Sequence, residues 1–169
     1  MRVYTANQTI IANLPYAAML LIGAATIAAA FGFSAAALAG AAGYVAYGVA
    51  GTLWVMIFIC PYCAYYATRS CPCGYGLAAA RLARKGDREC FAAKFRRHIP
   101  VIFALWAVPM VCGGIALWHS FSWQVAGLMA AFAIDAYVIL PLLSKRHSCA
   151  ECPQRDECPW MARRKPAAG

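Results

Sequence analysis

Long apolar stretches alternate with short polar ones along the chain, and this pattern predicts four membrane-spanning helices. No Asp, Glu, Lys or Arg occurs from residue 3 to residue 68, a stretch that divides into two apolar runs at about 11–33 and 36–59. After a charged segment, two further runs follow at about 99–118 and 123–143. Each run approaches the ~20 residues that a helix needs to cross a hydrocarbon layer of ~30 Å.

Small residues and aromatic residues indicate how these helices are joined and packed. Phe33 and Ser34 mark a tight reversal between the first two spans, which are rich in alanine and glycine and can therefore approach closely in lipid. Trp118, Phe121 and Trp123 mark an interfacial turn between the last two spans. We therefore expect an all-α, integral membrane four-helix bundle that forms a single membrane domain over residues 1–169.

Composition agrees with a membrane protein and excludes a nucleic-acid-binding one. The chain is 63% hydrophobic and 12% charged, with a mean hydropathy of +0.61, which is too apolar for a surface that faces water. Its net charge of +9 comes from basic residues that flank the predicted spans. No stacking platform or nucleic-acid motif surrounds them, so we interpret them as topology determinants.

The distribution of Lys and Arg predicts the orientation of the helices. Eight of the fifteen lie between the second and third spans, six follow the fourth, Arg2 precedes the first, and the two other turns contain none. Because cationic loops stay in the cytoplasm, both termini and the central loop should lie on the cytoplasmic side of a prokaryotic inner membrane. An N-terminal signal peptide cleaved after Ala39 is the alternative, but the long apolar run and the second run behind it favour a span.

The charged segments have an organisation of their own. Residues 61–98 form a loop rich in Cys and Arg, and residues 144–169 form a Cys-rich tail. In the loop, Ala and Leu alternate with Arg at helical spacing from Leu77 to Arg84, and Phe91 and Phe95 lie four residues apart. The pattern predicts one or two short amphipathic helices on the membrane surface, with lipid as a partner.

Eight of the nine cysteines occur in these two segments, at the ends of predicted spans. Four are followed directly by proline, which favours tight turns from which a thiol projects. A reducing cytoplasm disfavours disulfides, so metal binding is the leading interpretation. The candidate metal ligands are Cys60, Cys63, Cys71, Cys73, Cys90, Cys149, Cys152 and Cys158.

The spacing of the cysteines is compatible with one site or with two. The tail has a C-x2-C-x5-C array that needs a fourth ligand, for which Cys71, Cys73, Cys90 and His147 are all candidates. The loop has four thiols within fourteen residues, and Gly74 and Gly76 allow sharp turns beside them. Thiolate ligands suit both zinc and iron–sulfur clusters.

The runs Cys71-Pro72-Cys73-Gly74 and Cys158-Pro159 resemble the cysteine-proline motifs of ferredoxin-type, polyferredoxin-like four-span membrane proteins of respiratory chains. The resemblance covers these short stretches, and the full C-x2-C-x2-C-x3-C-P run is absent. It implies an iron–sulfur cofactor, electron transfer linked to a quinone, and other redox subunits or a cytoplasmic protein as partners. It would make the chain a membrane oxidoreductase subunit.

Two other functions remain open. Structural zinc, or another soft metal, could order the cysteine segments for docking of a cytoplasmic partner. The run Cys60-Pro-Tyr-Cys63 resembles a glutaredoxin active site and would make the chain a membrane thiol-disulfide oxidoreductase. However, Cys60 follows the C-terminal end of a predicted helix, where the helix dipole disfavours a thiolate.

Asp135 is the one acidic residue within a predicted span, so it is the candidate catalytic residue, as a proton relay or quinone contact. An interhelical hydrogen bond is the structural alternative. Cys112, inside the third span, is interpreted as a packing residue. The chain has no phosphate-binding glycine loop and no Ser-His-Asp order, so hydrolase and nucleotide-driven chemistry find no support.

Overall fold

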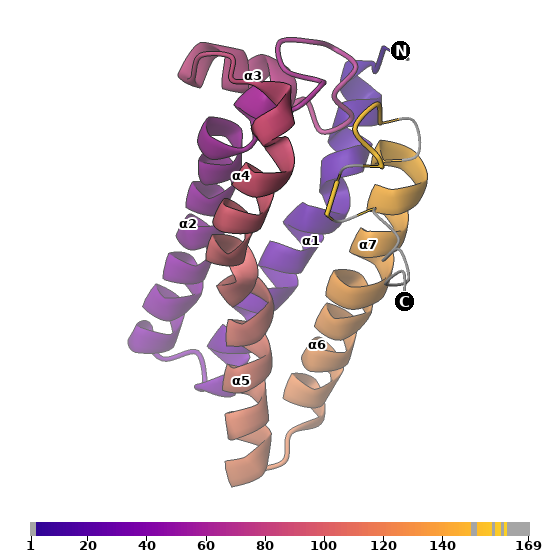
Figure 1. The fold of residues 1–169 in the computed structure, drawn as a ribbon. Coiled ribbons are helices and arrows are strands. Elements are labelled where there is room, and N and C mark those ends of the chain that lie inside the picture. Colours follow the sequence, from indigo (N-terminus) through magenta and orange to yellow (C-terminus); the bar gives the residue numbers. More distant parts are fainter. Residues whose placement is uncertain (1–2, 150–151, 157, 160, 162–169) are drawn as a thin grey trace, which may run out of the picture. The chain divides into compact units, whose positions relative to one another are not determined.

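The computed structural model describes residues 3–149, 152–156, 158–159 and 161, without the side chains of residues 147 and 148. Within these residues all regular structure is helical, as the hydropathy pattern predicted. Figure 1 shows the helices in chain order. In the described part of the chain, four stretches are long and apolar enough to cross a membrane, namely Ala6–Ala30, Ala35–Tyr62, Arg88–His119 and Trp123–Arg146.

The first two of these stretches are regular α-helices. Helix α1 spans Ala6–Ala30 and α2 spans Ala35–Phe58, close to the predicted spans. Between them, Gly32 and Phe33 adopt positive φ angles of 67° and 55°. The Phe33 N–H donates to the Ala28 carbonyl at 2.9 Å, so the end of α1 has the bonding pattern of a Schellman motif. The predicted reversal at residues 33–34 is confirmed.

The third stretch starts earlier than predicted. Short helix α3 spans Tyr75–Leu82, and α4 spans Phe91–His98, so the loop contains two short helices where the sequence predicted one or two. A 3-10 turn at Ile99–Phe103 then leads from α4 into α5, Ala104–His119. Pro100 lacks the N–H that an α-helix would use, and the tighter turn carries the chain past it without a break.

The fourth stretch contains wide helical turns. Helix α6 spans Trp123–Ile134, a π-helical turn covers Asp135–Ile139, and α7 covers Leu140–Leu143 before a second π-helical turn at Ser144–Ser148. The first wide turn comes just before Pro141, which has no N–H to continue the regular bonding ladder. The sequence pattern gave no sign of these turns.

The chain divides into two compact units, each of which combines separate segments. The four-helix unit consists of Asn13–Thr52 and Val101–Pro141. The cysteine-rich unit consists of Met1–Ala12, Leu53–Pro100 and the described part of Leu142–Gly169.

Parts of α1, α2, α5 and α6 share the core of the four-helix unit. Met19, Leu105 and Phe132 are fully buried in it. A side chain at Gly23 would collide with the Tyr44 ring, and one at Gly48 would collide with Leu20. Glycine therefore permits close packing at these two positions, as expected for helices in lipid.

Tyr44 also compensates for a proline within this core. Pro109 lies inside α5 and has no N–H, so the carbonyl of Leu105, four residues earlier, has no donor in the regular helical ladder. The Tyr44 hydroxyl donates to this carbonyl at 2.8 Å. A proline can therefore stay within an apolar helix, because a neighbouring helix supplies the missing hydrogen bond.

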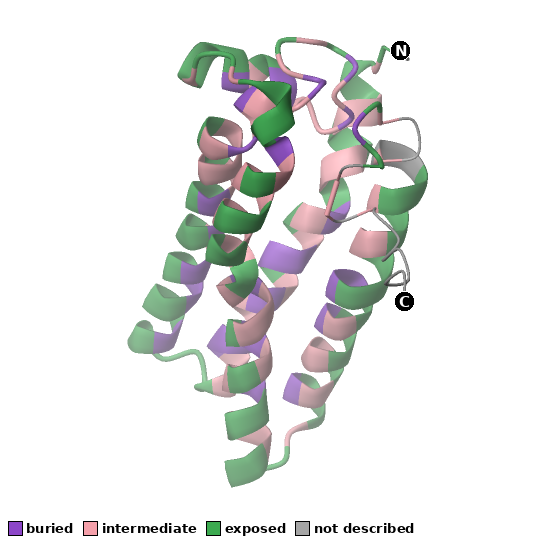
Figure 2. Cartoon of the chain, viewed as in Figure 1, coloured by how far each residue is buried: buried purple, intermediate pink, exposed green. Residues whose placement is uncertain are grey.

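The outer faces of the long helices are apolar as well. Leu21 on α1 is 67% exposed, Val111 on α5 is 57% exposed and Ile134 on α6 is 55% exposed. Figure 2 shows exposed residues, in green, along α2, α5 and α6. Apolar side chains over so much surface fit lipid as the surrounding solvent.

Candidate functional site

The cysteine-rich unit contains all eight predicted metal-ligand cysteines, whereas Cys112 lies in the four-helix unit. The two cysteine segments, separated by two long helices in the sequence, thus belong to one compact unit. All nine cysteines are free thiols.

The first segment follows α2 and consists of tight turns. Cys60–Tyr62 forms a 3-10 turn with Pro61 in its first turn, and the Cys63 N–H closes it by donating to the Cys60 carbonyl at 3.0 Å. Cys63 itself is extended. The proline after Cys60 thus has the turn-forming role that the sequence predicted.

Two glycines shape the chain around Cys71 and Cys73. Gly74 adopts a φ of 74° and precedes the first residue of α3, a conformation that favours glycine. A Cβ at Gly76 would collide with the Tyr65 carbonyl oxygen and would lie 3.2 Å from the Cβ of Cys71. The loop around Cys71 therefore packs against backbone at Gly76, where no larger residue fits.

Gln154 attaches the second cysteine segment to the first. Its side chain is 6% exposed, and its Oε1 accepts a 2.6 Å hydrogen bond from the Ala64 N–H, next to Cys63 in the sequence. Its Nε2 donates to the carbonyl oxygens of Tyr62 at 3.3 Å and Arg88 at 3.4 Å. One buried side chain thus joins the tail to two parts of the loop.

The electrostatics of Cys63 reflect this arrangement. Burial raises the pKa of the Cys63 thiol to about 11, although a hydrogen bond from the Tyr65 backbone lowers it. Neighbouring charge on Cys152, Cys71 and Cys158 raises the pKa further. Of the three thiols that act on Cys63, Cys71 lies in the loop, and Cys152 and Cys158 lie in the tail. Both cysteine segments therefore influence the Cys63 thiol.

The tail thiols behave in the same way. Burial raises the pKa of Cys152, the Gln154 backbone lowers it, and Cys158 and Cys71 raise it. Burial raises the pKa of Cys149 to about 11, and Cys158 and Cys152 add to the shift. Without a metal, these thiols are protonated at neutral pH.

Seven cysteines take part in these interactions, since Cys60 also interacts electrostatically with Cys63, Cys71 and Cys73. Cys90 differs: it is exposed and enters none of the cysteine interactions described for the other thiols. The seven are Cys60, Cys63, Cys71, Cys73, Cys149, Cys152 and Cys158.

These thiols do not form a ready ligand shell. Among the described residues, no three His, Cys, Asp or Glu side chains lie close enough together to hold a metal ion. Charge interactions extend well beyond the ~2.3 Å of a zinc–sulfur bond. The thiols can therefore influence one another's pKa without lying close enough to share a metal ion. The side chain of His147, one candidate for a fourth ligand, lies outside the described residues.

Of the remaining polar residues in or beside the spans, Asp135 and Cys112 belong to the four-helix unit and His98 to the cysteine-rich unit. Asp135 starts the π-helical turn after α6 and is 6% exposed. Cys112, on α5, packs against the core of the four-helix unit, as expected for a packing residue. His98 ends α4, and its ring stacks on Phe58 with 5.0 Å between ring centroids.

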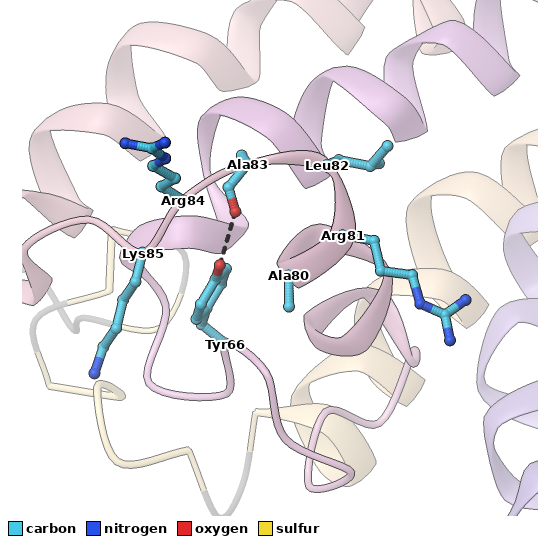
Figure 3. Close-up of a pocket in the computed structure, with 7 residues that line it drawn as sticks. All are labelled: Tyr66, Ala80, Arg81, Leu82, Ala83, Arg84 and Lys85. Atoms are coloured by element: carbon cyan, nitrogen blue, oxygen red, sulfur yellow. Dashed lines mark hydrogen bonds between the residues drawn. The ribbon is translucent and has the colours of Figure 1, made fainter.

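A groove lined by basic residues lies at the C-terminal end of α3. Arg81, Arg84 and Lys85 line it together with Tyr66, whose hydroxyl donates to the Ala83 carbonyl at 2.7 Å. Figure 3 shows the three cationic side chains pointing in different directions. They do not converge on one anion, and such a spread of charge suits a surface of lipid headgroups better.

Comparison of the chain with protein-family models, with curated proteins and with solved structures finds no match. The site therefore has to be interpreted from its own residues. Gln154, its main connecting residue, was missed in the sequence, because nothing in the run Cys-Pro-Gln-Arg-Asp-Glu-Cys distinguishes one buried polar residue from its exposed neighbours.

Proposed function

We propose that the chain is an integral inner-membrane protein whose cysteine-rich unit binds an iron–sulfur cluster and serves electron transfer linked to a quinone, as a subunit of a larger redox assembly. The membership of seven electrostatically interacting thiols from two distant segments in one compact unit is the observation that carries this proposal. Four thiolates are the usual complement of such a cluster.

A metal would stabilise this unit by bringing its thiols closer together. Buried thiols without a metal keep their protons, and a bound cation compensates for the charge of several thiolates at once. The hydrogen bond between Gln154 and Ala64 already holds the tail at the loop, so the tail thiols have only a short distance to move in order to bind the same metal as the loop thiols. The cost of ordering the ligands is therefore smaller than for a flexible tail.

Iron–sulfur chemistry is favoured over zinc by the residues around the thiols. Cys71 and Cys158 are followed by proline, as are ligand cysteines in ferredoxin-type motifs. The four apolar stretches suit a protein that exchanges electrons with a lipid-soluble carrier. The basic loop and tail support an orientation with the cysteines and both termini in the cytoplasm.

A thiol-disulfide oxidoreductase is less consistent with the site. A reactive thiol needs a lowered pKa, because the thiolate is the nucleophile. Burial instead raises the pKa of Cys63, in the C-x-x-C run, to about 11.

Metal and sulfide analysis of anaerobically purified protein tests the proposal. We expect iron and acid-labile sulfide in the wild-type protein, with a visible absorption that bleaches on reduction. Cys152→Ser should remove both, because Cys152 interacts with thiols of both segments. Cys112→Ser is the matched control, and it should retain the cluster because Cys112 lies in the four-helix unit.

The other outcomes identify the alternatives. Colourless protein with stoichiometric zinc would exclude the iron–sulfur proposal and leave a structural zinc site that docks a cytoplasmic partner. Protein without metal, with a Cys60–Cys63 disulfide that forms and breaks under redox buffers, would exclude both metal sites. Cys90→Ser separates the ligands further: Cys90 is exposed, so we expect this variant to keep its metal.

A further inference from the structure

Asp135 is a buried acid in an apolar environment. It lies in the four-helix unit, is 6% exposed, and sits in the chain between Phe132 and Ala136, both of which belong to the core. Its Oδ2 atom is buried and has no hydrogen-bond partner among the described residues. The interhelical hydrogen bond that would give this oxygen a purely structural role is therefore not present.

No Lys or Arg in the same unit can compensate for a carboxylate at this position. Asn13–Thr52 and Val101–Pro141 contain no Lys, no Arg and no acidic residue other than Asp135. Their one histidine, His119, ends α5 at the turn that leads into α6, whereas Asp135 follows the last residue of α6. A carboxylate at the centre of a membrane helix is unfavourable, because the hydrocarbon layer does not solvate its charge. A bound proton removes this cost, because it neutralises the group.

The backbone at Asp135 is also irregular. The Asp135 N–H is shared between the carbonyls of Ala131 and Phe132, and the Leu140 N–H reaches back to the Asp135 carbonyl across a π-helical turn. Such wide turns are often found at functional sites, since they change the direction of a side chain relative to its helix. Asp135 thus combines an unpaired oxygen with a special backbone position.

We propose that Asp135 is an exchangeable proton-binding site within the four-helix unit, a function that goes beyond the proposed metal site. In the binding step, one carboxylate oxygen forms an O–H bond with an incoming proton and the group becomes neutral. In the release step, the same bond breaks and the proton leaves. No electron is transferred, so the step needs no oxidant or reductant.

Infrared difference spectroscopy of the protein in lipid vesicles tests this site. We expect the wild-type protein to show the carbonyl band of a protonated carboxylic acid that shifts on transfer to D2O, because the proton exchanges. The band should vanish in Asp135→Asn. It should also vanish in wild-type protein treated with dicyclohexylcarbodiimide, a lipid-soluble reagent that forms an adduct with protonated carboxyls, with the adduct mapped to Asp135 by mass spectrometry.

The reagent makes the assignment independent of how well the Asn variant folds. Asp87 and Glu89, which are exposed in the cysteine-rich unit, are internal controls that should react only with a water-soluble carbodiimide. Absence of an exchanging band, or a band that survives loss of the Asp135 carboxyl, overturns the proposal. The metal content of Asp135→Asn should equal that of the wild-type protein, so failure of this proposal and failure of the metal site are distinguishable.

Discussion

The four-helix unit and the cysteine-rich unit are stabilised in different ways. In the four-helix unit, long helices pack through apolar and small side chains, and the Tyr44 hydroxyl supplies the hydrogen bond that Pro109 removes from α5. In the cysteine-rich unit, the helices are short, and turns and segments are joined by individual hydrogen bonds such as those of Gln154. The first unit depends on many small contacts and the second on a few specific ones.

This difference has a consequence for mutation. Packing spread over many side chains tolerates single changes, whereas a turn that depends on one glycine or one amide does not. Substitution of a turn glycine in the cysteine-rich unit should therefore have a larger effect than substitution of a glycine without close neighbours in the four-helix unit; Gly23 and Gly48, which contact side chains, do not belong to this comparison.

The glycines provide the largest expected contrast. In Gly76→Ala, the new Cβ would collide with the Tyr65 carbonyl oxygen and approach Cys71. Since backbone cannot move aside as a flexible side chain does, we expect a loss of about 3 kcal/mol of local stability. The measurement is the rate of alkylation of Cys71 in the folded protein, which should rise strongly.

Gly43→Ala is the same substitution at an open position of the four-helix unit. A Cβ at Gly43 has no neighbour within 4 Å, and the residue lies within α2. Alanine in a helix is favoured over glycine by about 0.5–1 kcal/mol, so this variant should be slightly more stable in thermal unfolding. Equal effects of the two changes would contradict the contrast between the units.

The second prediction concerns pH. Because the pKa values of Cys63 and Cys149 are raised to about 11, both thiols are protonated at neutral pH and a metal has to displace their protons. Metal affinity should therefore rise with pH, by about tenfold per pH unit for each proton displaced. Competition with a chelator, with Zn²⁺ as the probe between about pH 6 and pH 8, measures the slope.

Cys149→Ser is the control for this slope. If Cys149 is a ligand, its loss should reduce the slope by about one proton. An affinity that does not change with pH would show that no protonated thiol binds the metal.

The long helices could be predicted from hydropathy, but several of their limits could not. Hydropathy placed the start of the first span near residue 11, whereas α1 begins at Ala6. The reason is a capping box, in which Thr5 and Gln8 bond to each other's backbone N–H groups at 3.1 and 3.4 Å. This signal was present in the sequence as Thr-x-x-Gln.

Other features depend on tertiary contacts and could not be predicted. The cysteine spacing identified the residues that gather in one unit, but not Gln154, whose role comes from partners that lie 66–92 positions away. The π-helical turn at Asp135 likewise has no signature in the hydropathy pattern. Pro141, shortly after it, is visible in the sequence, but a proline does not by itself predict a π-helical turn. Exposed Cys90 looked like its neighbours in the sequence and differs from them only in the fold.

The third prediction concerns Gln154. Gln154→Ala removes three hydrogen bonds between the tail and the loop, and residues that orient ligands typically change metal affinity by about 10–100-fold. We expect a loss of affinity in that range by chelator competition. Gln154→Glu should lose less, because its carboxylate can still accept from the Ala64 N–H but cannot donate to Tyr62 and Arg88.

Gln124→Ala is the matched control, since Gln124 is exposed in the first turn of α6. It should leave metal affinity unchanged. If Gln154→Ala binds metal as tightly as Gln124→Ala, the tail does not depend on this side chain to reach the loop.

The smallest expected effect is in the four-helix unit. Tyr44→Phe removes the hydroxyl that donates to the Leu105 carbonyl, which Pro109 leaves without its helical donor. A buried carbonyl without a partner costs about 1–2 kcal/mol, and hydrogen bonds between membrane helices are usually at the lower end of this range. Thermal unfolding in detergent should show this loss, while the metal content should stay at the wild-type level.

Tyr137→Phe removes the same atom from an exposed tyrosine in the π-helical turn, so it should leave stability unchanged. The pair distinguishes a specific hydrogen bond from a general preference for tyrosine in the unit. A Tyr44→Phe variant as stable as Tyr137→Phe would mean that α5 tolerates the open Leu105 carbonyl by itself. The Tyr44 hydroxyl would then not be needed for Pro109.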